Sequence, residues 1–398
     1  MQRRALTEAE RLDWLQLIRS DNVGPVTFHA LLAKFGTASR ALAALPDLVA
    51  KTPGGSTAKR AVRLAKREVA EKELAAATRH GARLIAACEP DYPEALAALP
   101  DAPPVIAVHG RAERLAGPCV GIVGARNGSA NGRRFAAQLA ADLGAAGITV
   151  VSGLARGIDT AAHEGALAPG SIGGTVAVIA GGIDVVYPPE NGPLMARIAQ
   201  EGRGAVIAEQ PFGLKPQARH FPYRNRVISG LSRALIVVEA TLKSGSLITA
   251  RLAAEQGREV LAVPGSPLDP RSAGPNGLIR DGATLITGAG DVLAALDGVR
   301  GPLDSPFEQN QWVKGPSGLE ISAFSQPPQE LEDTLDGASD LPDKILKLLG
   351  FSPTSIDDLA RRAHVSPASL ASAILELELA GRVERQAGGQ ISLIISKP

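Results

Sequence analysis

The sequence predicts an α/β fold with a doubly wound, mostly parallel sheet, and two observations carry this prediction. Short apolar runs alternate with helical periodicity and glycine-rich turns between residues 86 and 300. Seven of these runs are expected to form strands, at residues 105–108, 120–123, 148–151, 175–179, 204–207, 234–238 and 260–263. Such continuous apolar runs are typical of strands covered by helices on both faces. Glycine-rich or charged motifs follow the strands, where ligands of such sheets bind.

Three further parts flank this predicted sheet domain of residues 86–300. Residues 1–85 have helical periodicity, and a capping box of Thr7 and Glu10 is expected to start the first helix. Residues 301–342 are acidic and rich in proline, which predicts a flexible linker. Residues 343–398 show helices followed by two short strands, and Ser366 is expected to cap the last helix. This order is typical of a winged-helix domain.

The roles of the two flanking domains stay open at this stage. The segment from Asn22 to Gly36 resembles a helix-hairpin-helix (or SAM-like) module, which offers backbone amides to a DNA phosphate. Similar helical hairpins are also common without ligands. The last helix of the winged-helix domain carries Glu376 and Glu378 and almost none of the side chains that read bases. We therefore favour a partner-binding or regulatory role for that domain.

Composition excludes several classes of protein. A net charge of +1 over 398 residues excludes a globally basic nucleic-acid coat, although it leaves room for a local basic patch. Cys88 and Cys119 stand alone, so neither a disulfide framework nor a metal site is expected. The first residues lack the apolar segment of a signal peptide, and no run of 18 apolar residues occurs. We expect a cytoplasmic protein that does not insert into membranes.

The turn from Gly121 to Gly132 lies between a predicted strand and a helix, an arrangement that holds phosphates. A dinucleotide site would have GxGxxG here and an acid at the end of the next strand. This turn instead carries Arg126, and the next strand ends in Ser152 and Gly153. A nucleotide cofactor is therefore not expected, and a phosphodiester held by a guanidinium fits better.

Further turns at the same predicted edge bear similar groups. One carries Arg156 between glycines, and another places Lys243 and Ser244 before a helix, again suited to an anion. Tyr187 follows a further strand, where its ring either supports a base or closes the loop. No nucleophile motif accompanies His163 and its neighbouring acid, so we expect His163 to pack against the sheet.

The segment from Arg219 to Ser232 combines charge with aromatic rings. Six Lys or Arg residues and a single acid occur from Arg203 to Arg233. Arginines beside Phe221 and Tyr223 offer both phosphate neutralisation and stacking faces, which single-stranded nucleic acid requires. A merely solvated loop would explain the charges but would explain the aromatic residues poorly.

Taken in order, these motifs resemble the DNA-processing protein A (DprA/Smf) family. The resemblance covers about residues 85–300 and rests on GIVGARNGS, SGLARGIDTAAH, GGIDVVYPPEN, FPYRNRVISGLS, EATLKSGSLITA, VPG and GPNGLIRDGA. It implies an extended Rossmann fold that binds single-stranded DNA without a cofactor or known catalysis. It also implies protection of incoming DNA in natural transformation, displacement of single-strand-binding protein, loading of the RecA recombinase, and a homodimer.

The resemblance also implies which residues contact DNA. Its phosphate-contacting turn and basic pocket wall correspond to Gly124, Arg126, Ser129, Arg224, Asn225, Arg226 and Lys243. The neighbouring motifs add Arg156, Phe221 and Ser244 to the expected DNA-binding set. The alternative is an enzyme similar to a nucleoside monophosphate phosphoribohydrolase. Those enzymes share a PGGxGTxxE motif that the strand end from Glu239 to Ser246 lacks, so we do not expect an enzyme.

Overall fold

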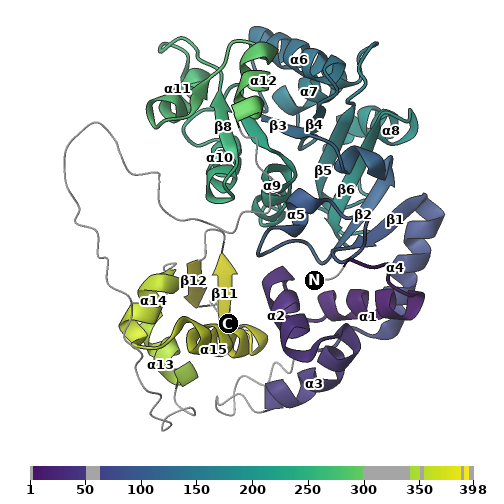
Figure 1. The fold of residues 1–398 in the computed structure, drawn as a ribbon, viewed down its shortest axis with the longest axis vertical. Coiled ribbons are helices and arrows are strands. Elements are labelled where there is room, and N and C mark those ends of the chain that lie inside the picture. Colours follow the sequence, from purple (N-terminus) through teal and green to yellow (C-terminus); the bar gives the residue numbers. More distant parts are fainter. Residues whose placement is uncertain (1–2, 51–62, 299–340, 350–353, 387–389, 394–398) are drawn as a thin grey trace.

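The computed structural model describes residues 3–50, 63–298, 341–349, 354–386 and 390–393, and its centre is a nine-stranded sheet (Figure 1). The strand order is β1-β2-β6-β5-β4-β3-β7-β8-β9. The strands are β1 (Ala82–Ala86), β2 (Val105–Gly110), β3 (Cys119–Val123), β4 (Thr149–Ser152), β5 (Thr175–Gly182), β6 (Gly204–Gln210), β7 (Ala234–Val237), β8 (Glu259–Ala262) and β9 (Thr284–Leu285). All seven predicted strands are present, and β1 and β9 add to them.

The sheet is mostly parallel, as predicted. Every neighbouring pair from β6 across to β9 is parallel. Strand β2 runs antiparallel to β6, and β1 runs antiparallel to β2. The one predicted strand that departs from the parallel arrangement, β2, therefore belongs to an antiparallel edge, a common addition to doubly wound sheets.

Helices cover both faces of the sheet, which makes the fold doubly wound (Figure 1). One face carries α6 (Ala130–Ala145), α7 (Ile158–Ala166), α8 (Gly192–Gln200) and α12 (Ala289–Gly298). The other carries α5 (Glu94–Ala97), α9 (His220–Leu231) and α10 (Gly245–Glu255), while α11 (Ala273–Arg280) follows β8. The side chains of β3 alternate between the two helical layers. Val120 and Ile122 pack against the first layer, and Cys119 and Val123 pack against the second.

The arginine-rich segment is helix α9 rather than a loop. Pro222 is the third residue of this helix. A helical N–H in the first turn has no partner within the helix, so proline is tolerated there. Helix α9 begins after the loop that follows β6 and packs beneath the sheet through Val227, Ile228 and Leu231.

The chain reverses direction across the sheet at β3. It runs from β3 outward through β4, β5 and β6, and then returns to the other side of β3 as β7. The turns after β3, β4, β5, β6 and β7 therefore lie along one edge, which we call the carboxyl edge. The turns after β3 and β7 flank the point of reversal, where ligands of such sheets bind.

In the described ranges 3–50 and 63–81, four helices precede the sheet: α1 (Glu8–Ile18), α2 (Pro25–Phe35), α3 (Ala38–Ala50) and α4 (Arg67–His80). The predicted capping box is confirmed, because the Thr7 hydroxyl accepts the Glu10 N–H and the Glu10 carboxylate accepts the Thr7 N–H. The rings of Trp14 and Phe28 lie 4.9 Å apart in the core of these helices. Strand β1, inside the range assigned to the helical domain, already belongs to the sheet.

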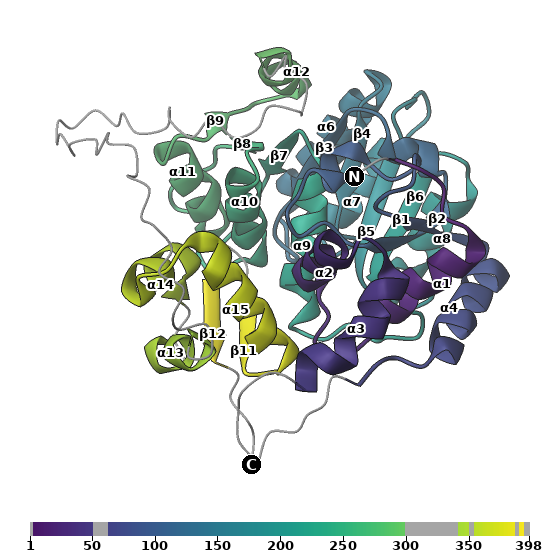
Figure 2. The ribbon, with the colours of Figure 1, turned by 60° about the horizontal axis from the view of Figure 1, so that its bottom comes forward.

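The C-terminal part has the predicted winged-helix order. Its elements are α13 (Leu341–Leu348), β10 (Thr354–Ser355), α14 (Ile356–Ala363), α15 (Pro367–Leu379), β11 (Val383–Gln386) and β12 (Gln390–Leu393). Ser366 caps α15 as expected, by accepting the Ser369 N–H. The predicted linker lies outside the described residues, apart from its last two, which begin α13. Helix α15 packs beside α2 (Figure 1, Figure 2).

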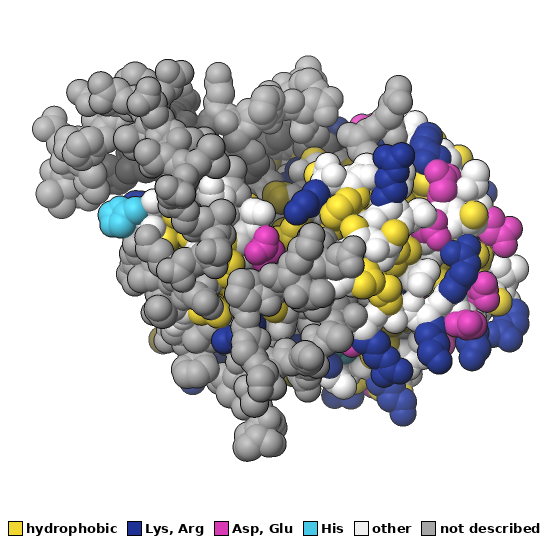
Figure 3. All heavy atoms as spheres, turned by 90° about the horizontal axis from the view of Figure 1, so that it is seen from below, with side chains coloured by type: hydrophobic (Ala, Val, Ile, Leu, Met, Phe, Trp, Pro, Cys, Tyr) yellow, Lys and Arg dark blue, Asp and Glu magenta, His cyan; other side chains and the backbone are white. Residues whose placement is uncertain are grey.

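The surface seen from below carries both signs of charge. Over the described part of this face, Lys and Arg side chains are mixed with Asp and Glu (Figure 3). Within the described ranges, no helix is long and apolar enough to cross a membrane, and no three His, Cys, Asp or Glu side chains are grouped to bind a metal.

Candidate nucleic-acid interface

A carboxylate from across the point of reversal holds the turn after β3. Ser129 caps α6 by accepting the Gly132 N–H at 2.9 Å. Glu239, which follows β7, accepts the Ser129 N–H at 2.8 Å and the Ser129 hydroxyl at 2.6 Å. A Cβ on Gly132 would lie 2.5 Å from this carboxylate, so glycine makes room for it. The first turn of α6, where the sequence predicts a phosphate, thus already holds an anion of the protein itself.

Two predicted contact residues of this turn have structural partners. Ser129 uses its amide and its hydroxyl on Glu239. A Cβ on Gly124 would lie 2.7 Å from the Ile158 side chain, so glycine lets α7 approach the end of β3. Sequence reasoning missed Glu239 as the anchor of the turn. The available signal was an acid placed directly after the strand that flanks the point of reversal.

Arg126 remains available at the same turn. Its side chain is exposed and makes no salt bridge to another described residue. Its guanidinium carbon lies 5.3 Å from the centre of the Phe221 ring, a cation–π arrangement. Arg224 approaches the same ring at 5.7 Å, and the Tyr187 ring lies 5.8 Å from it. The structure therefore brings Arg126 and Phe221 together and adds Tyr187 to them.

Arg224 points into the protein and is only 8% exposed. Its Nη1 donates to the carbonyls of Gly153 and Val178, which ties the end of β4 to β5. A Cβ on Gly153 would lie 1.9 Å from that nitrogen, which explains the glycine. Burial lowers the pKa of Arg224 to about 10, with the Asp159 carboxylate opposing this shift and the Arg126 charge adding to it. Arg224 thus acts as a brace inside the carboxyl edge.

His163 and Asp159 belong to the same buried network. The Leu154 N–H donates to Nε2 of His163, so Nδ1 carries the proton and donates to the Thr175 hydroxyl at 2.7 Å. Asp159 accepts the backbone N–H groups of Gly153 and Ala155. Burial lowers the pKa of His163 to about 3, and burial raises the pKa of Asp159. His163 packs against the sheet, as expected, with Leu154 and Thr175 as its partners.

Arg226 and Asn225 are turned inward as well. Arg226, 4% exposed, forms ion pairs with Glu209 and, at 3.5 Å, with Asp101. The Asn225 amide donates to the Gly245 carbonyl at 3.5 Å and so links α9 to α10. The predicted basic pocket wall of Arg224, Asn225 and Arg226 stays a prediction, although the structure turns these three side chains inward. All three are buried and each donates to a carbonyl group of another segment, whereas the Nε of Arg224 has no hydrogen-bond partner among the described residues.

The remaining predicted residues lie at the surface of the carboxyl edge. Arg156 forms an exposed ion pair with Glu190. Lys243 is exposed and has no salt bridge to another described residue. Ser244 caps α10, and its hydroxyl is paired with that of Ser246 at 2.7 Å. Unlike α6, helix α10 has no carboxylate of the described chain hydrogen-bonded at its first turn.

Arg219 is a further cation that the predicted set omits. It lies directly before α9 and is exposed, and its Nε donates to the ring of His220 at 3.4 Å. No carboxylate in the described ranges pairs with it. Its position immediately before the first turn of α9, two residues from Phe221, was the signal that sequence reasoning could have used.

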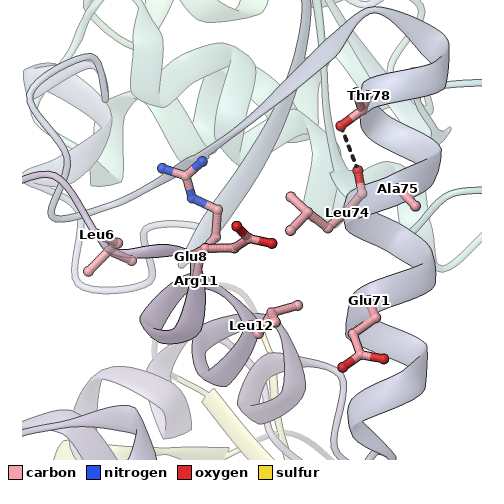
Figure 4. A pocket seen from close by; sticks show the side chains of 8 residues that line it. All are labelled: Leu6, Glu8, Arg11, Leu12, Glu71, Leu74, Ala75 and Thr78. Carbon is pink, nitrogen blue, oxygen red and sulfur yellow. Dashed lines mark hydrogen bonds between the residues drawn. The ribbon is translucent and has the colours of Figure 1, made fainter.

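A cavity of about 470 Å³ lies away from the carboxyl edge, between α1 and α4 (Figure 4). Its lining consists of Leu6, Glu8, Arg11, Leu12, Glu71, Leu74, Ala75 and Thr78. None of these belongs to the predicted DNA-binding set. The cavity and the predicted DNA-binding residues therefore lie in different parts of the molecule.

The winged-helix domain contacts the turn before α2 and the start of that helix. The Asn22 side chain donates to the Leu379 carbonyl at 3.3 Å, and the Thr27 hydroxyl donates to Glu378 at 3.4 Å. This is the turn whose amides a helix-hairpin-helix would offer to a phosphate. In the structure the end of α15 lies against it, so the packing interpretation of the hairpin has a concrete partner.

Known proteins match this chain in all three parts. The DNA recombination-mediator protein A family matches residues 83–297, the DprA-like N-terminal HHH domain residues 8–76, and the DprA winged helix domain residues 326–389. Protein Smf from Synechocystis sp. is 31% identical over 410 residues, which cover 96% of this chain and 98% of the relative. DNA processing protein DprA from Streptococcus pneumoniae is 44% identical over 206 residues, 52% of this chain and 71% of the relative.

A solved structure agrees with these sequence matches. The X-ray structure of DNA processing protein A from Streptococcus pneumoniae has a TM-score of 0.57 and 33% identity, and the match covers 73% of this chain and 98% of that one. The fold, the order of the domains and the full-length similarity lead to one assignment: the chain belongs to the DNA recombination-mediator protein A family.

Proposed function

We propose that the carboxyl edge binds single-stranded DNA through exposed cations on phosphates and aromatic rings beside bases. The observation that carries the proposal is the pair of Arg126 and Lys243. These two exposed charges flank the point of reversal, and no carboxylate of the described chain neutralises them. Rings beside Arg126 add stacking faces, and cations combined with rings suit single strands. Membership in a recombination-mediator family supports the same function.

The proposed contact set contains Arg126, Arg219, Phe221, Lys243 and Ser244. Arg156 joins this set once a phosphate replaces Glu190, because an exposed ion pair contributes little free energy. Gly124, Ser129, Arg224, Asn225 and Arg226 form the scaffold that holds the contact residues in place. This division follows from the exposure of each side chain and from its hydrogen-bond and ion-pair partners.

A nucleotide-processing enzyme fits the same edge less well. A nucleoside monophosphate would place its phosphate at the first turn of α6, where the Glu239 carboxylate lies. The Glu239 carboxylate and a phosphate at this turn would repel each other, so the turn disfavours a free phosphate. We propose a protein that acts without nucleotide turnover; incubation with AMP should release no free base, and release would contradict the proposal.

For the cell we propose a cytoplasmic recombination mediator that protects incoming DNA in natural transformation, displaces single-strand-binding protein and loads RecA as a homodimer. The domain ranges 1–85, 86–300, 301–342 and 343–398 belong to the same proposal. The three-part family match supports it. The test is RecA filament assembly on a strand coated with single-strand-binding protein: this protein should accelerate it, and an unchanged rate would contradict the loading role.

Binding itself is tested with labelled oligothymidylate and a duplex of the same length, by fluorescence anisotropy. We expect tighter binding to the single strand, because the rings need unpaired bases. Binding should weaken as salt rises, because released counterions drive it. Equal affinity for both forms, or no binding at low salt, would contradict the proposal.

A further inference from the structure

Tyr187 is an aromatic residue of the carboxyl edge that the proposed contact set does not use. It follows β5 and is 45% exposed. Its ring centre lies 5.8 Å from that of Phe221, with 61° between the two planes. Its hydroxyl makes no hydrogen bond to another described residue. Packing against Phe221 therefore leaves Tyr187 45% exposed.

The loop that carries Tyr187 is anchored at both ends. Asp184 accepts the Gly213 N–H at 2.8 Å, which joins the loop to the one after β6. Asn191 is buried and donates to the Leu154 carbonyl at 2.8 Å, which joins it to the turn after β4. The ring is thus held in position before any ligand binds, so little ordering free energy is lost on binding.

The two neighbouring rings differ in what surrounds them. Phe221 has guanidinium groups at 5.3 and 5.7 Å, from Arg126 and Arg224. Tyr187 has no cation over its ring among the described residues. Tyr187, which is 45% exposed, is therefore the ring left for a base, while Arg126, held against Phe221, is left for a phosphate of the same strand.

We propose that Tyr187 is a stacking platform for a base of the bound single strand, braced at its edge by Phe221. The inference deepens the proposed function and rests on it. It resolves the choice that the sequence leaves open for this ring in favour of base support. Because stacking uses the π face, the platform accepts any base and requires the ring but not the hydroxyl.

The test compares two oligonucleotides with the same phosphates, oligothymidylate and a strand of equal length whose central nucleotides are abasic. Tyr187→Ala should weaken binding to oligothymidylate by about 5-fold to 100-fold, the range for one stacked base. The same variant should change binding to the abasic strand by less than about twofold. Tyr187→Phe should keep wild-type affinity for both strands. The dependence of affinity on salt should be unchanged in Tyr187→Ala, because no phosphate contact is lost.

Ile172 provides the control. It is 66% exposed and precedes β5, so it lies at the end of that strand opposite Tyr187. Ile172→Ala should leave both affinities within about twofold of wild type. Wild-type protein that binds no single strand would overturn the proposed function itself. Wild-type binding with equal effects of Tyr187→Ala on both strands, or with no effect on either, would overturn the stacking role and leave the proposed function standing.

Discussion

Arg126 and Arg226 both come from motifs rich in arginine, yet they meet opposite environments. Arg226 is buried and shares its charge with Glu209 and Asp101. Arg126 is exposed, and no described carboxylate pairs with it. Arg224 is buried like Arg226, and Lys243 is exposed like Arg126. Of the five cations in the predicted DNA-binding set, two are thus internal braces and two are free for a ligand, while Arg156 forms an exposed ion pair.

The difference comes from partners rather than from the motifs themselves. An arginine leaves water only where carbonyl or carboxylate groups satisfy its donors, because an unpaired buried charge costs several kcal/mol. We call the buried Arg224 and Arg226 inner cations, and the exposed Arg126 and Lys243 outer cations. The two kinds should therefore respond differently to substitution. Loss of an inner cation should act on folding stability, and loss of an outer one should act on DNA affinity.

The largest effect should come from Arg226→Ala. This change leaves the Glu209 carboxylate, whose side chain is 16% exposed, without the counter-charge of Arg226, and breaking a largely buried pair costs about 3–5 kcal/mol of unfolding free energy. Urea unfolding measures it. Arg126→Ala is the matched outer variant and should stay within about 0.5 kcal/mol of wild type. Similar stabilities for the two variants would remove the distinction between inner and outer cations.

Mildly acidic pH should lower the folding stability through His163, which lies in the buried network of Arg224 and Asp159. Burial lowers the pKa of His163 to about 3, whereas the unfolded chain takes up that proton near pH 6.5. Between these values the unfolded state binds the proton and the folded state does not. The stability from this group is therefore complete above about pH 6.5 and falls as the pH drops, by about 2 kcal/mol at pH 5.

Unfolding free energies at pH 7 and pH 5, for wild type and His163→Gln, isolate this contribution. The variant should lose less stability between the two pH values, because glutamine does not titrate. An equal loss in both proteins would show that His163 does not carry the acid sensitivity of the buried network.

Among the outer cations, Arg126→Ala should weaken binding to oligothymidylate by about tenfold, the range for one charge-assisted phosphate contact. Anisotropy titrations at constant salt measure it. Arg197→Ala, which removes an exposed arginine of α8 paired with Glu201, is the control and should leave affinity unchanged. A loss of the same size in the control would mean that overall charge, rather than the carboxyl edge, determines binding.

The smallest expected effects on stability and DNA affinity come from the two serine helix caps, Ser129 and Ser244. Ser129→Ala and Ser244→Ala should each cost about 1 kcal/mol of stability, because each removes a helix cap. Only Ser244→Ala should also weaken DNA binding, by about twofold, because Glu239 already fills the first turn of α6. A DNA effect confined to Ser129→Ala would reverse this assignment.

Much of the fold could be predicted because its strands are continuous apolar runs. Strand β9 escaped prediction because it has two residues and both are exposed. Helix α9 was not predicted, and it tolerates Pro222 because this residue lies in its first turn. Local patterns thus sufficed for seven strands of the sheet. They missed β1, whose first four residues were assigned to the helical domain, and the elements that depend on their neighbours.

The candidate site was harder to predict because its decisive contacts are distant in sequence. Arg226 donates to the Asp101 carbonyl, 125 residues away, and Glu239 meets Ser129 across 110 residues. No local pattern distinguishes Arg226 from Arg126, since both are arginines in charged, glycine-rich or aromatic surroundings. Only the folded arrangement of carboxylates shows which cations remain free.

The most direct test of the account is the salt dependence of oligothymidylate binding by wild type and by the double variant Arg126→Ala, Lys243→Ala. The slope of log affinity against log salt reports the number of phosphates neutralised, at about 0.7 for each on a single strand. The account predicts a slope shallower by about 1.4 in the double variant, with unchanged unfolding. An unchanged slope would contradict the claim that the carboxyl edge holds the strand through these two outer cations.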